Sequence, residues 1–275
     1  MYKAIYKYAP LSEYLIDALK NNYYVFSCPS ELNDVYDCQL PVNVGIQKDK
    51  AYKEIANIIS GVSGLINNDE DEEFARTLNN ILLTNVKDNE KNYFIKVVKK
   101  LVSEQRVTCF SEDFDNMPMW AHYANNHNGV CLKFEYPDDQ MSLFSYLAKV
   151  NYVEKLPRLK LPNFEDINPR EEDYDFINQL LLTKQKKWEY ENELRLIFLK
   201  DQLKTINSIR SMLNYPPDAL TGVYFGYNVD TNGVLYQKIV ECCRHKARPP
   251  KLHIRRKNEG SFGSYWKKVT EDGEL

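Results

Sequence analysis

The sequence predicts an α+β protein with a mixed sheet, on three observations. Short runs rich in β-branched and aromatic residues, at 2–8, 23–27, 106–111 and 129–135, have the length and boundaries of strands. Apolar residues at helical spacing, as in Leu11–Leu19, lie between such runs. The tail has the pattern strand, helix, strand at 221–227, 234–245 and 252–257. We therefore expect a mixed sheet that ends in a C-terminal strand–helix–strand.

The remaining elements follow in chain order. Pro10 ends the first strand and Pro29 ends the run at 23–27. Residues from about 50 to 104 are polar, helical in pattern and short of turn residues, which predicts a helical insertion. A short helix is expected near 119–124, a strand at 149–153, a helix ending near Lys187, and a strand over 188–199. With no repeat or Gly-rich linker, we expect a single domain, 1–275, with a helical insertion at about 50–104.

Composition narrows the class of protein. The chain has 275 residues, of which 43% are hydrophobic and 27% charged, as in ordinary globular proteins. No apolar run approaches the roughly 18 residues that cross a bilayer, and no secretory signal pattern opens the chain. We therefore expect a cytoplasmic protein without membrane association. Its 6 scattered cysteines are expected to be reduced, and Cys242, Cys243 and His245 lack a second ligand pair, so no metal is expected.

Charge is unevenly distributed along the chain. The formal net charge is −3, but the segment from Lys238 to Lys268 has ten Lys or Arg and only two acidic residues. Such a segment is either a solvated basic face or a surface for a polyanion. The candidate nucleic-acid-binding residues are Lys251, Arg255, Arg256 and Lys257.

The sharpest motif is the run Trp188–Arg195. If it is a strand, Glu191, Glu193 and Arg195 share one face, because alternate side chains of a strand point the same way. Further along, that face becomes apolar, so its polar end suits a cleft at the end of the strand. The alternative is a solvated face with a carboxylate–guanidinium pair, which would contribute little stability.

Two further motifs are polar and aromatic. In the segment 26–37, Ser27, Asn33 and Asp34 follow a strand and either cap turns or present a loop to a ligand. In the segment 109–129, a helix would place His122 and Tyr123 on one side, and His127 is poorly spaced for a shared metal. The sequence offers no nucleophile–base triad, phosphate loop or dinucleotide-binding glycine turn.

These three motifs, in this order, resemble a bacterial family known as domain of unknown function 2971. The resemblance rests on the stretches 6–38, 107–135, 187–197 and 220–228. The family in turn looks distantly similar to the ADP-ribosyltransferase fold, in which a basic strand residue, a Ser-bearing strand and a Glu-x-Glu strand form the site. Lys7, Ser27 and Glu191–Glu193 stand at the comparable places, with Lys7 where Arg or His is usual. The resemblance implies an ADP-ribosyltransferase-like core.

The resemblance also implies roles for individual residues. NAD would be the substrate, Glu193 would stabilise the positive charge on the ribose as the nicotinamide bond breaks, and Glu191 would orient the acceptor. Lys7 and Ser27 would hold the dinucleotide, and Tyr190 or Trp120 would border the ring. The other candidate cofactor-binding residues are Tyr8, Asn33, Asp34, His122, Tyr123 and Arg195.

The resemblance also implies a biological role, by analogy of fold alone. The protein would be a toxin or phage-defence effector that modifies nucleic acid or protein, with an antitoxin as a partner. The first alternative is a non-enzymatic module that binds nucleic acid or a protein through its basic tail. The second, a hydrolase or nuclease using the same carboxylates, lacks the convergent acidic ligands of a metal nuclease. If the transferase interpretation holds, strands 2–8, 23–27 and 188–199 should adjoin in one sheet, with Lys7, Ser27 and Glu193 around a common pocket.

Overall fold

The computed structural model describes residues 3–38, 99, 102–136, 146–155, 157 and 179–270. The chain divides into two compact units, the first formed by 1–31, 105–152 and 186–275 and the second by 32–104 and 153–185. The predicted helical insertion at about 50–104 lies almost wholly outside the described residues. It therefore stays a prediction, as does the single-domain organisation.

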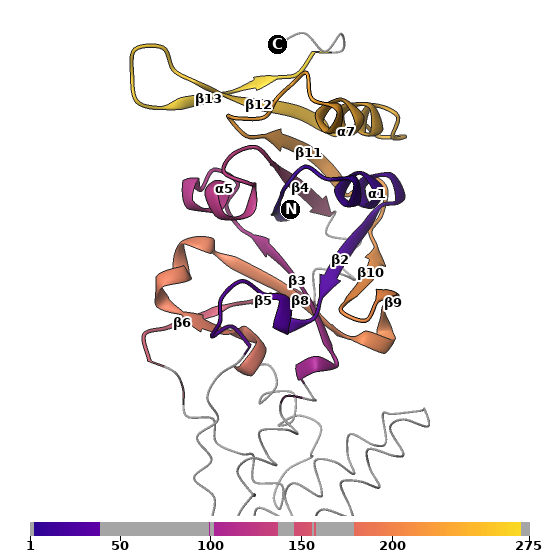
Figure 1. The fold of residues 1–275 in the computed structure, drawn as a ribbon, viewed down its shortest axis with the longest axis vertical. Coiled ribbons are helices and arrows are strands. Elements are labelled where there is room, and N and C mark those ends of the chain that lie inside the picture. The colour runs from indigo at the N-terminus through magenta and orange to yellow at the C-terminus, as the bar shows by residue number, and fades with distance from the viewer. Residues whose placement is uncertain are drawn as a thin grey trace, which may run out of the picture. The chain divides into compact units, whose positions relative to one another are not determined.

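The first unit is built on one large mixed sheet, which confirms the α+β class (Figure 1). Among the described residues this sheet has 11 strands, and a separate two-stranded sheet consists of β6 and β7. The strands are β1 (Lys3–Ala9), β2 (Tyr23–Ser27), β3 (Gln105–Ser111), β4 (Val130–Tyr136), β5 (Ala148–Lys149), β6 (Asn151–Val153), β7 (Thr183–Gln185), β8 (Glu193–Leu199), β9 (Lys204–Asn207), β10 (Arg210–Asn214), β11 (Leu220–Phe225), β12 (Lys251–Lys257) and β13 (Ser264–Lys268). The helices are α1 (Glu13–Asn21), α5 (Met117–Tyr123) and α7 (Val234–Arg244), and the 3-10 helices are η1 (Pro29–Glu31), η4 (Lys186–Glu191) and η5 (Lys200–Gln202).

The strand order in the large sheet is β13-β12-β11-β4-β1-β3-β2-β10-β9, with β8 pairing to β3 and β5 pairing to β8. Pairing is antiparallel except between β11 and β12, which are parallel and are connected through α7. Strand β11, helix α7 and strand β12 together form the predicted C-terminal strand–helix–strand. As predicted, β1, β2 and β8 lie in one sheet, where each of them pairs with β3 and not with one another.

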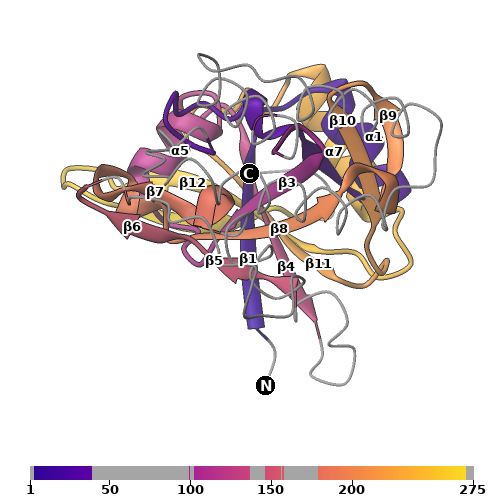
Figure 2. The same ribbon diagram turned by 90° about the horizontal axis from the view of Figure 1, so that it is seen from below.

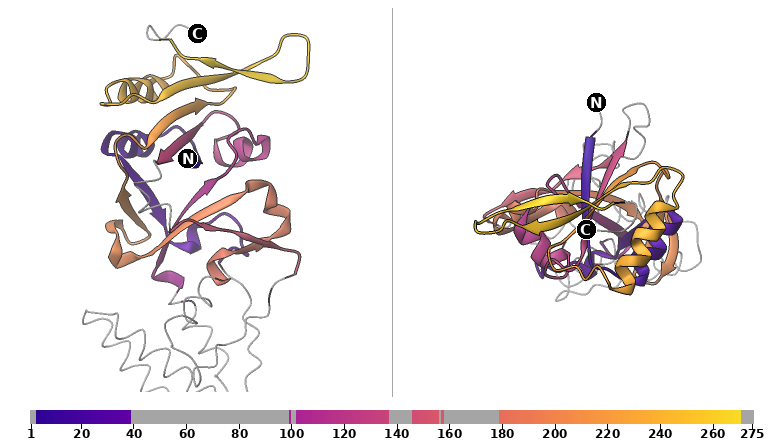
Figure 3. Two further views of the ribbon diagram at one scale, coloured as in Figure 1. Left: turned by 180° about the vertical axis from the view of Figure 1, so that it is seen from behind. Right: turned by 90° about the horizontal axis from the view of Figure 1, so that it is seen from above.

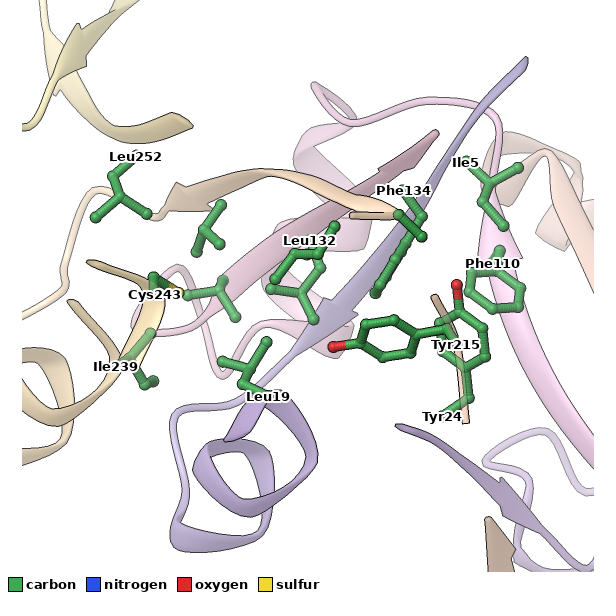
Figure 4. Close-up of a cluster of buried hydrophobic side chains, with 14 of the residues drawn as sticks. Ile5, Leu19, Tyr24, Phe110, Leu132, Phe134, Tyr215, Ile239, Cys243 and Leu252 are labelled. Carbon is green, nitrogen blue, oxygen red and sulfur yellow. The ribbon is translucent and has the colours of Figure 1, made fainter. Parts of the chain in front are cut away.

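The sheet is covered on both faces. Helices α1 and α7 contact each other on one face, and α5 lies on the other (Figures 1 and 2). Under α1 and α7 lies the main hydrophobic core, in which Tyr24, Tyr215, Phe110 and Phe134 pack ring against ring (Figure 4). Under α5 lies a second, aromatic cluster that includes Trp120.

Local chemistry sets the helix ends. The Ser12 hydroxyl accepts a hydrogen bond from the Leu15 amide at 3.1 Å, and Asn22 ends α1 in a left-handed conformation with φ of 53°. The side chain of Asn116 caps α5 in the same way. After α5 the chain turns through three left-handed residues at 125–127, which carries it directly into β4.

Two predicted elements have the wrong limits. The strand expected over 188–199 begins only at Glu193, because residues 186–191 form the 3-10 helix η4. An ion pair of 2.6 Å between Lys186 and Glu189 spans one turn of η4, and Asn192 adopts a φ of 43° that separates helix from strand. The helix expected to end near Lys187 gives way to strand β7 at Thr183. No helix among the described residues is long and apolar enough to cross a membrane.

Candidate functional site

The predicted polar end of β8 is a buried ion pair. Glu193, the first residue of the strand, and Arg195 lie on one face, as the alternation of the strand requires. Arg195 Nε donates to Glu193 Oε1 at 2.7 Å and Nη2 donates to Oε2 at 3.1 Å. The exposed fractions are 4% for Glu193 and 0% for Arg195, so the solvated face that the sequence left open is not what forms. The Glu193 carboxylate is instead held in a fixed orientation.

Glu191, the last residue of η4, is held by hydrogen bonds from α5 and β3. Tyr123 of α5 donates its hydroxyl to Glu191 Oε1 at 2.6 Å, and the Ser111 hydroxyl of β3 donates to the Glu191 carbonyl at 2.6 Å. The side-chain amide of Asn116 donates to the carbonyl of Tyr190, also at 2.6 Å. Glu191 is itself only 2% exposed. The Glu-x-Glu segment is therefore clamped between α5 and the end of β3, where β3 pairs Ser111 with Glu193.

Three aromatic side chains lie beside the carboxylates. The rings of His122 and Tyr190 stack at 6.5 Å and 28°, and Trp188 lies 6.1 Å from His122 and 6.0 Å from Tyr190. His122 is exposed, whereas Trp188 and Tyr190 are half-buried. Together these three rings form a partly exposed aromatic ledge next to the Glu-x-Glu segment.

Trp120 and Tyr8 have a different place from the one expected. Trp120 is fully buried, packs edge-on against Tyr8 at 5.3 Å and donates its indole N–H to the Phe114 carbonyl at 2.9 Å. Tyr8 is 9% exposed and donates its hydroxyl to the Asp113 carbonyl. Both belong to the aromatic cluster beneath α5, and the Trp120 ring has no exposed surface with which to border a ligand.

Lys7 lies on the opposite face of the sheet from Glu193. Tyr6 pairs with Ser111 and Ser111 with Glu193, which places those three on one face and Lys7, the next residue, on the other. The Lys7 ammonium donates to Thr108 Oγ1 at 2.8 Å and to the Cys109 carbonyl at 3.0 Å. Burial lowers the pKa of Lys7, and electrostatic interactions with Cys109 and Glu193 partly offset that effect. The Lys7 ammonium therefore interacts electrostatically with Glu193, but its hydrogen bonds are to residues of β3.

The environment of Cys109 also reflects the buried charges. Burial, followed by the charge of Glu193, raises the pKa of the Cys109 thiol. The thiol is therefore protonated at neutral pH and is a poor nucleophile.

Ser27 shares the face of Glu193 but not its end of the sheet. Ser27 pairs with Val107, four residues along β3 from Ser111, which is about 13 Å at roughly 3.3 Å per residue. An apolar cavity of about 170 Å³ is bordered by Lys7 and by core residues of α1, β2 and β4, but neither Ser27 nor Glu193 is among its lining residues. Because Lys7 lies on the opposite face of the sheet from Ser27 and Glu193, the predicted common pocket for all three residues is wrong.

Asn33 and Asp34 belong to the second unit. Asp34 Oδ1 accepts a hydrogen bond from the Tyr36 amide at 3.0 Å, which is the turn-forming role expected of a short acidic side chain. In the same unit Lys184 Nζ lies 3.5 Å from Asp37 Oδ2, with both side chains buried.

The basic tail separates into buried and exposed cations. Arg255 is 5% exposed, pairs with Asp115 at 2.6 Å, and lies over the rings of Tyr227 and Trp266 at 4.8 and 5.2 Å. Its charge is therefore matched inside the protein. Lys251 and Lys257 are exposed and Arg256 is half-buried, so these three retain access to a partner.

No group of three His, Cys, Asp or Glu side chains among the described residues is arranged to hold a metal. No disulfide joins the six cysteines, each of which lies in a described part of the chain. Sequence reasoning missed Ser111 and Asn116 as partners of the site. Their signal was present, because both fall in the motif at 109–129, and Asn116 precedes Pro118 as a helix cap should.

Comparison with known proteins supports the resemblance. Residues 119–196 match the model of the family described as "Protein of unknown function (DUF2971)". No curated protein and no solved structure matches the chain. The matched range begins in α5 and ends in β8, so it contains Tyr123, the η4 helix and the ion pair of Glu193 with Arg195. In the part that builds the candidate site, this chain therefore resembles the DUF2971 family.

Proposed function

We propose that this protein is an NAD-consuming ADP-ribosyltransferase that modifies nucleic acid or protein, with an effector role of the toxin or phage-defence kind. The observation that carries the proposal is the arrangement of Glu191 and Glu193, two carboxylates fixed next to a partly exposed aromatic ledge. A flat nicotinamide ring would pack on Tyr190 and His122, which brings its ribose toward the carboxylates.

The proposed chemistry is a displacement at the anomeric carbon. The bond between that carbon and the nicotinamide nitrogen breaks, and its electron pair leaves with neutral nicotinamide. Positive charge develops on the ribose and is stabilised by the Glu193 carboxylate. An acceptor nucleophile oriented by Glu191 then bonds to the carbon, and its proton passes to Glu191.

Arg195 would act as a positioning residue in this scheme. Its two hydrogen bonds hold both oxygens of Glu193, which fixes the direction of the carboxylate before the substrate binds. Tyr123 has the same relation to Glu191. A carboxylate that is already oriented does not have to reorganise during the reaction. Such preorganisation is the main source of electrostatic catalysis.

The test incubates the protein with labelled NAD and total cellular RNA, DNA and protein. Transfer of label is expected for the wild type, and Glu193→Gln should reduce its rate about 10²–10³-fold. Glu189→Gln is the matched control, because Glu189 lies in the 3-10 helix η4 that precedes Glu193 and its side chain is 53% exposed. Loss of label in both variants would reflect a folding defect, so the circular dichroism spectrum of each is compared. Absence of both label transfer and a calorimetric signal for NAD binding would refute the proposal.

A binding module without enzymatic activity is the second candidate. The observation in its favour is the set of exposed cations on β12 and β13, which the transferase chemistry does not use.

A further inference from the structure

The hairpin of β12 and β13 presents an aromatic tip. Its connecting loop, 258–263, extends away from α7 (Figure 3). Phe262 in this loop is fully exposed and Tyr265, at the start of β13, is 50% exposed. Because the Phe262 side chain is fully exposed, its ring is available to a partner.

The same hairpin has an excess of positive charge. Five of its cations form no salt bridge with any carboxylate of the described residues, and the hairpin's own acidic residue is Glu259. These five cations are Lys251, Arg256, Lys257, Lys267 and Lys268. Their positive charge affects a neighbouring titratable group. The pKa of His253 is lowered mainly by burial and further by Lys251 and Lys268. The hairpin therefore has a local positive field although the chain as a whole is acidic.

The hairpin is held rigidly in place. Arg255 donates from Nε to Ser264 at 2.9 Å, across the two strands, and its guanidinium lies over Trp266. The Asp115 carboxylate, which precedes α5, pairs with the same guanidinium at 2.6 Å. On the same face of the sheet as Arg255, the His253 ring stacks on the Tyr224 ring of β11, with a centroid distance of 5.1 Å and an interplanar angle of 12°. A surface fixed in advance loses little conformational entropy when a partner binds.

The register sets how charges and rings alternate on the hairpin. Arg256 pairs with Tyr265, so a cation and an exposed ring stand side by side on one face. Lys257 pairs with Ser264 on the other face, next to the loop that bears Phe262. Cations for phosphates interleaved with rings for bases are the combination by which proteins bind single strands of nucleic acid.

We infer that the face of the β12–β13 hairpin that bears Lys251, Lys257 and Lys268 binds single-stranded nucleic acid, with Phe262 in the adjoining loop stacking on a base and these three lysines contacting phosphates. A single strand is favoured over a duplex because only unpaired bases offer their faces to a ring. A membrane surface is disfavoured, because one Phe and one Tyr provide little of the continuous apolar face that membrane binding requires. The inference does not depend on NAD chemistry, although it would make nucleic acid the acceptor if the proposed transferase activity holds.

The experiment titrates the full chain into fluorescein-labelled 12-nucleotide RNA and DNA of mixed sequence and follows fluorescence anisotropy at several salt concentrations. Each phosphate contact with a single strand contributes a slope of about −0.7 in log K against log salt, so three contacts give about −2.1. The double variant Lys257→Gln with Lys268→Gln should weaken binding and reduce the slope by about 1.4. Phe262→Ala should weaken binding by about 5- to 150-fold, the usual range for one stacked base, and leave the slope unchanged.

Lys204→Gln is the matched control, because Lys204 is an exposed lysine on β9 at the other edge of the sheet. It should bind as the wild type does. No saturable binding at about 50 mM salt, or equal weakening by the control, would overturn the inference. Tighter binding to a labelled duplex, or Phe262-dependent binding only to phosphatidylserine vesicles, would also overturn it. At a temperature at which its circular dichroism spectrum matches that of the wild type, Glu193→Gln should retain oligonucleotide binding even where label transfer is lost, so failure of the hairpin and of the NAD site are distinguishable.

Discussion

Removal of one charge from the ion pair between Glu193 and Arg195 should destabilise the protein strongly. In Glu193→Gln the side chain keeps its shape, but the guanidinium of Arg195, which has no exposed surface, loses its counter-charge. Each hydrogen bond to a charged group typically contributes about 1.5–3 kcal/mol, and glutamine can accept only one of the two. With the uncompensated buried charge added, we expect the free energy of unfolding to fall by about 3–5 kcal/mol.

The assay is urea denaturation followed by tryptophan fluorescence and circular dichroism. With a denaturant dependence of about 1–3 kcal/mol/M, the midpoint of the variant should fall by more than about 1 M. Glu189→Gln is the control and should remain within about 0.5 kcal/mol of the wild type, because its side chain is half in solvent.

A double variant separates the charge from the packing. Glu193→Leu combined with Arg195→Met removes both charges, so its stability should lie much closer to the wild type than that of Glu193→Gln. The reasoning is refuted if Glu193→Gln unfolds within about 0.5 kcal/mol of the wild type, or if the double variant is less stable than the single one.

Two further predictions concern the packing around α5 and β12. Gly226→Ala should lower the free energy of unfolding by about 1–3 kcal/mol, because its added Cβ would lie 2.2 Å from the backbone oxygen of His127; an unchanged denaturation midpoint would contradict the close approach. Burial, with smaller effects from nearby cations, lowers the pKa of His127 and His253, so the unfolded chain binds protons at a higher pH than the folded protein. Stability should therefore fall as pH decreases from about 6.5 through those lowered pKa values, and replacing both histidines by Gln should flatten this decrease in a thermal-melting series.

Much of the sheet follows from local sequence. The run 23–27 is bounded by Asn22 and Pro29, and the strand found there, Tyr23–Ser27, has the predicted limits. Apolar periodicity likewise placed α1 and α7, and the strand–helix–strand tail formed as expected. These elements were predictable because a residue's own propensity and its neighbours within one or two turns determine them.

The candidate site was only partly predictable. Alternation of side chains correctly put Glu193 and Arg195 on one face, but it could not show that Glu191 lies in a 3-10 helix. That conformation depends on Tyr123 and Ser111, which bind Glu191 from sequence distances of 68 and 80 residues. Likewise, Arg255 looked like one more surface cation until its pairing with Asp115 showed it to be buried.

By itself the sequence determined the fold class, most strands of the main sheet and the resemblance to the DUF2971 family, since propensity and motif order are local properties. Only the tertiary structure decided which charges are buried and which face a partner. Burial of a charge depends on counter-charges and packing atoms that distant segments supply. For that reason Arg195 and Arg255 became internal ion pairs, while Lys257 and Lys268 stayed on the surface.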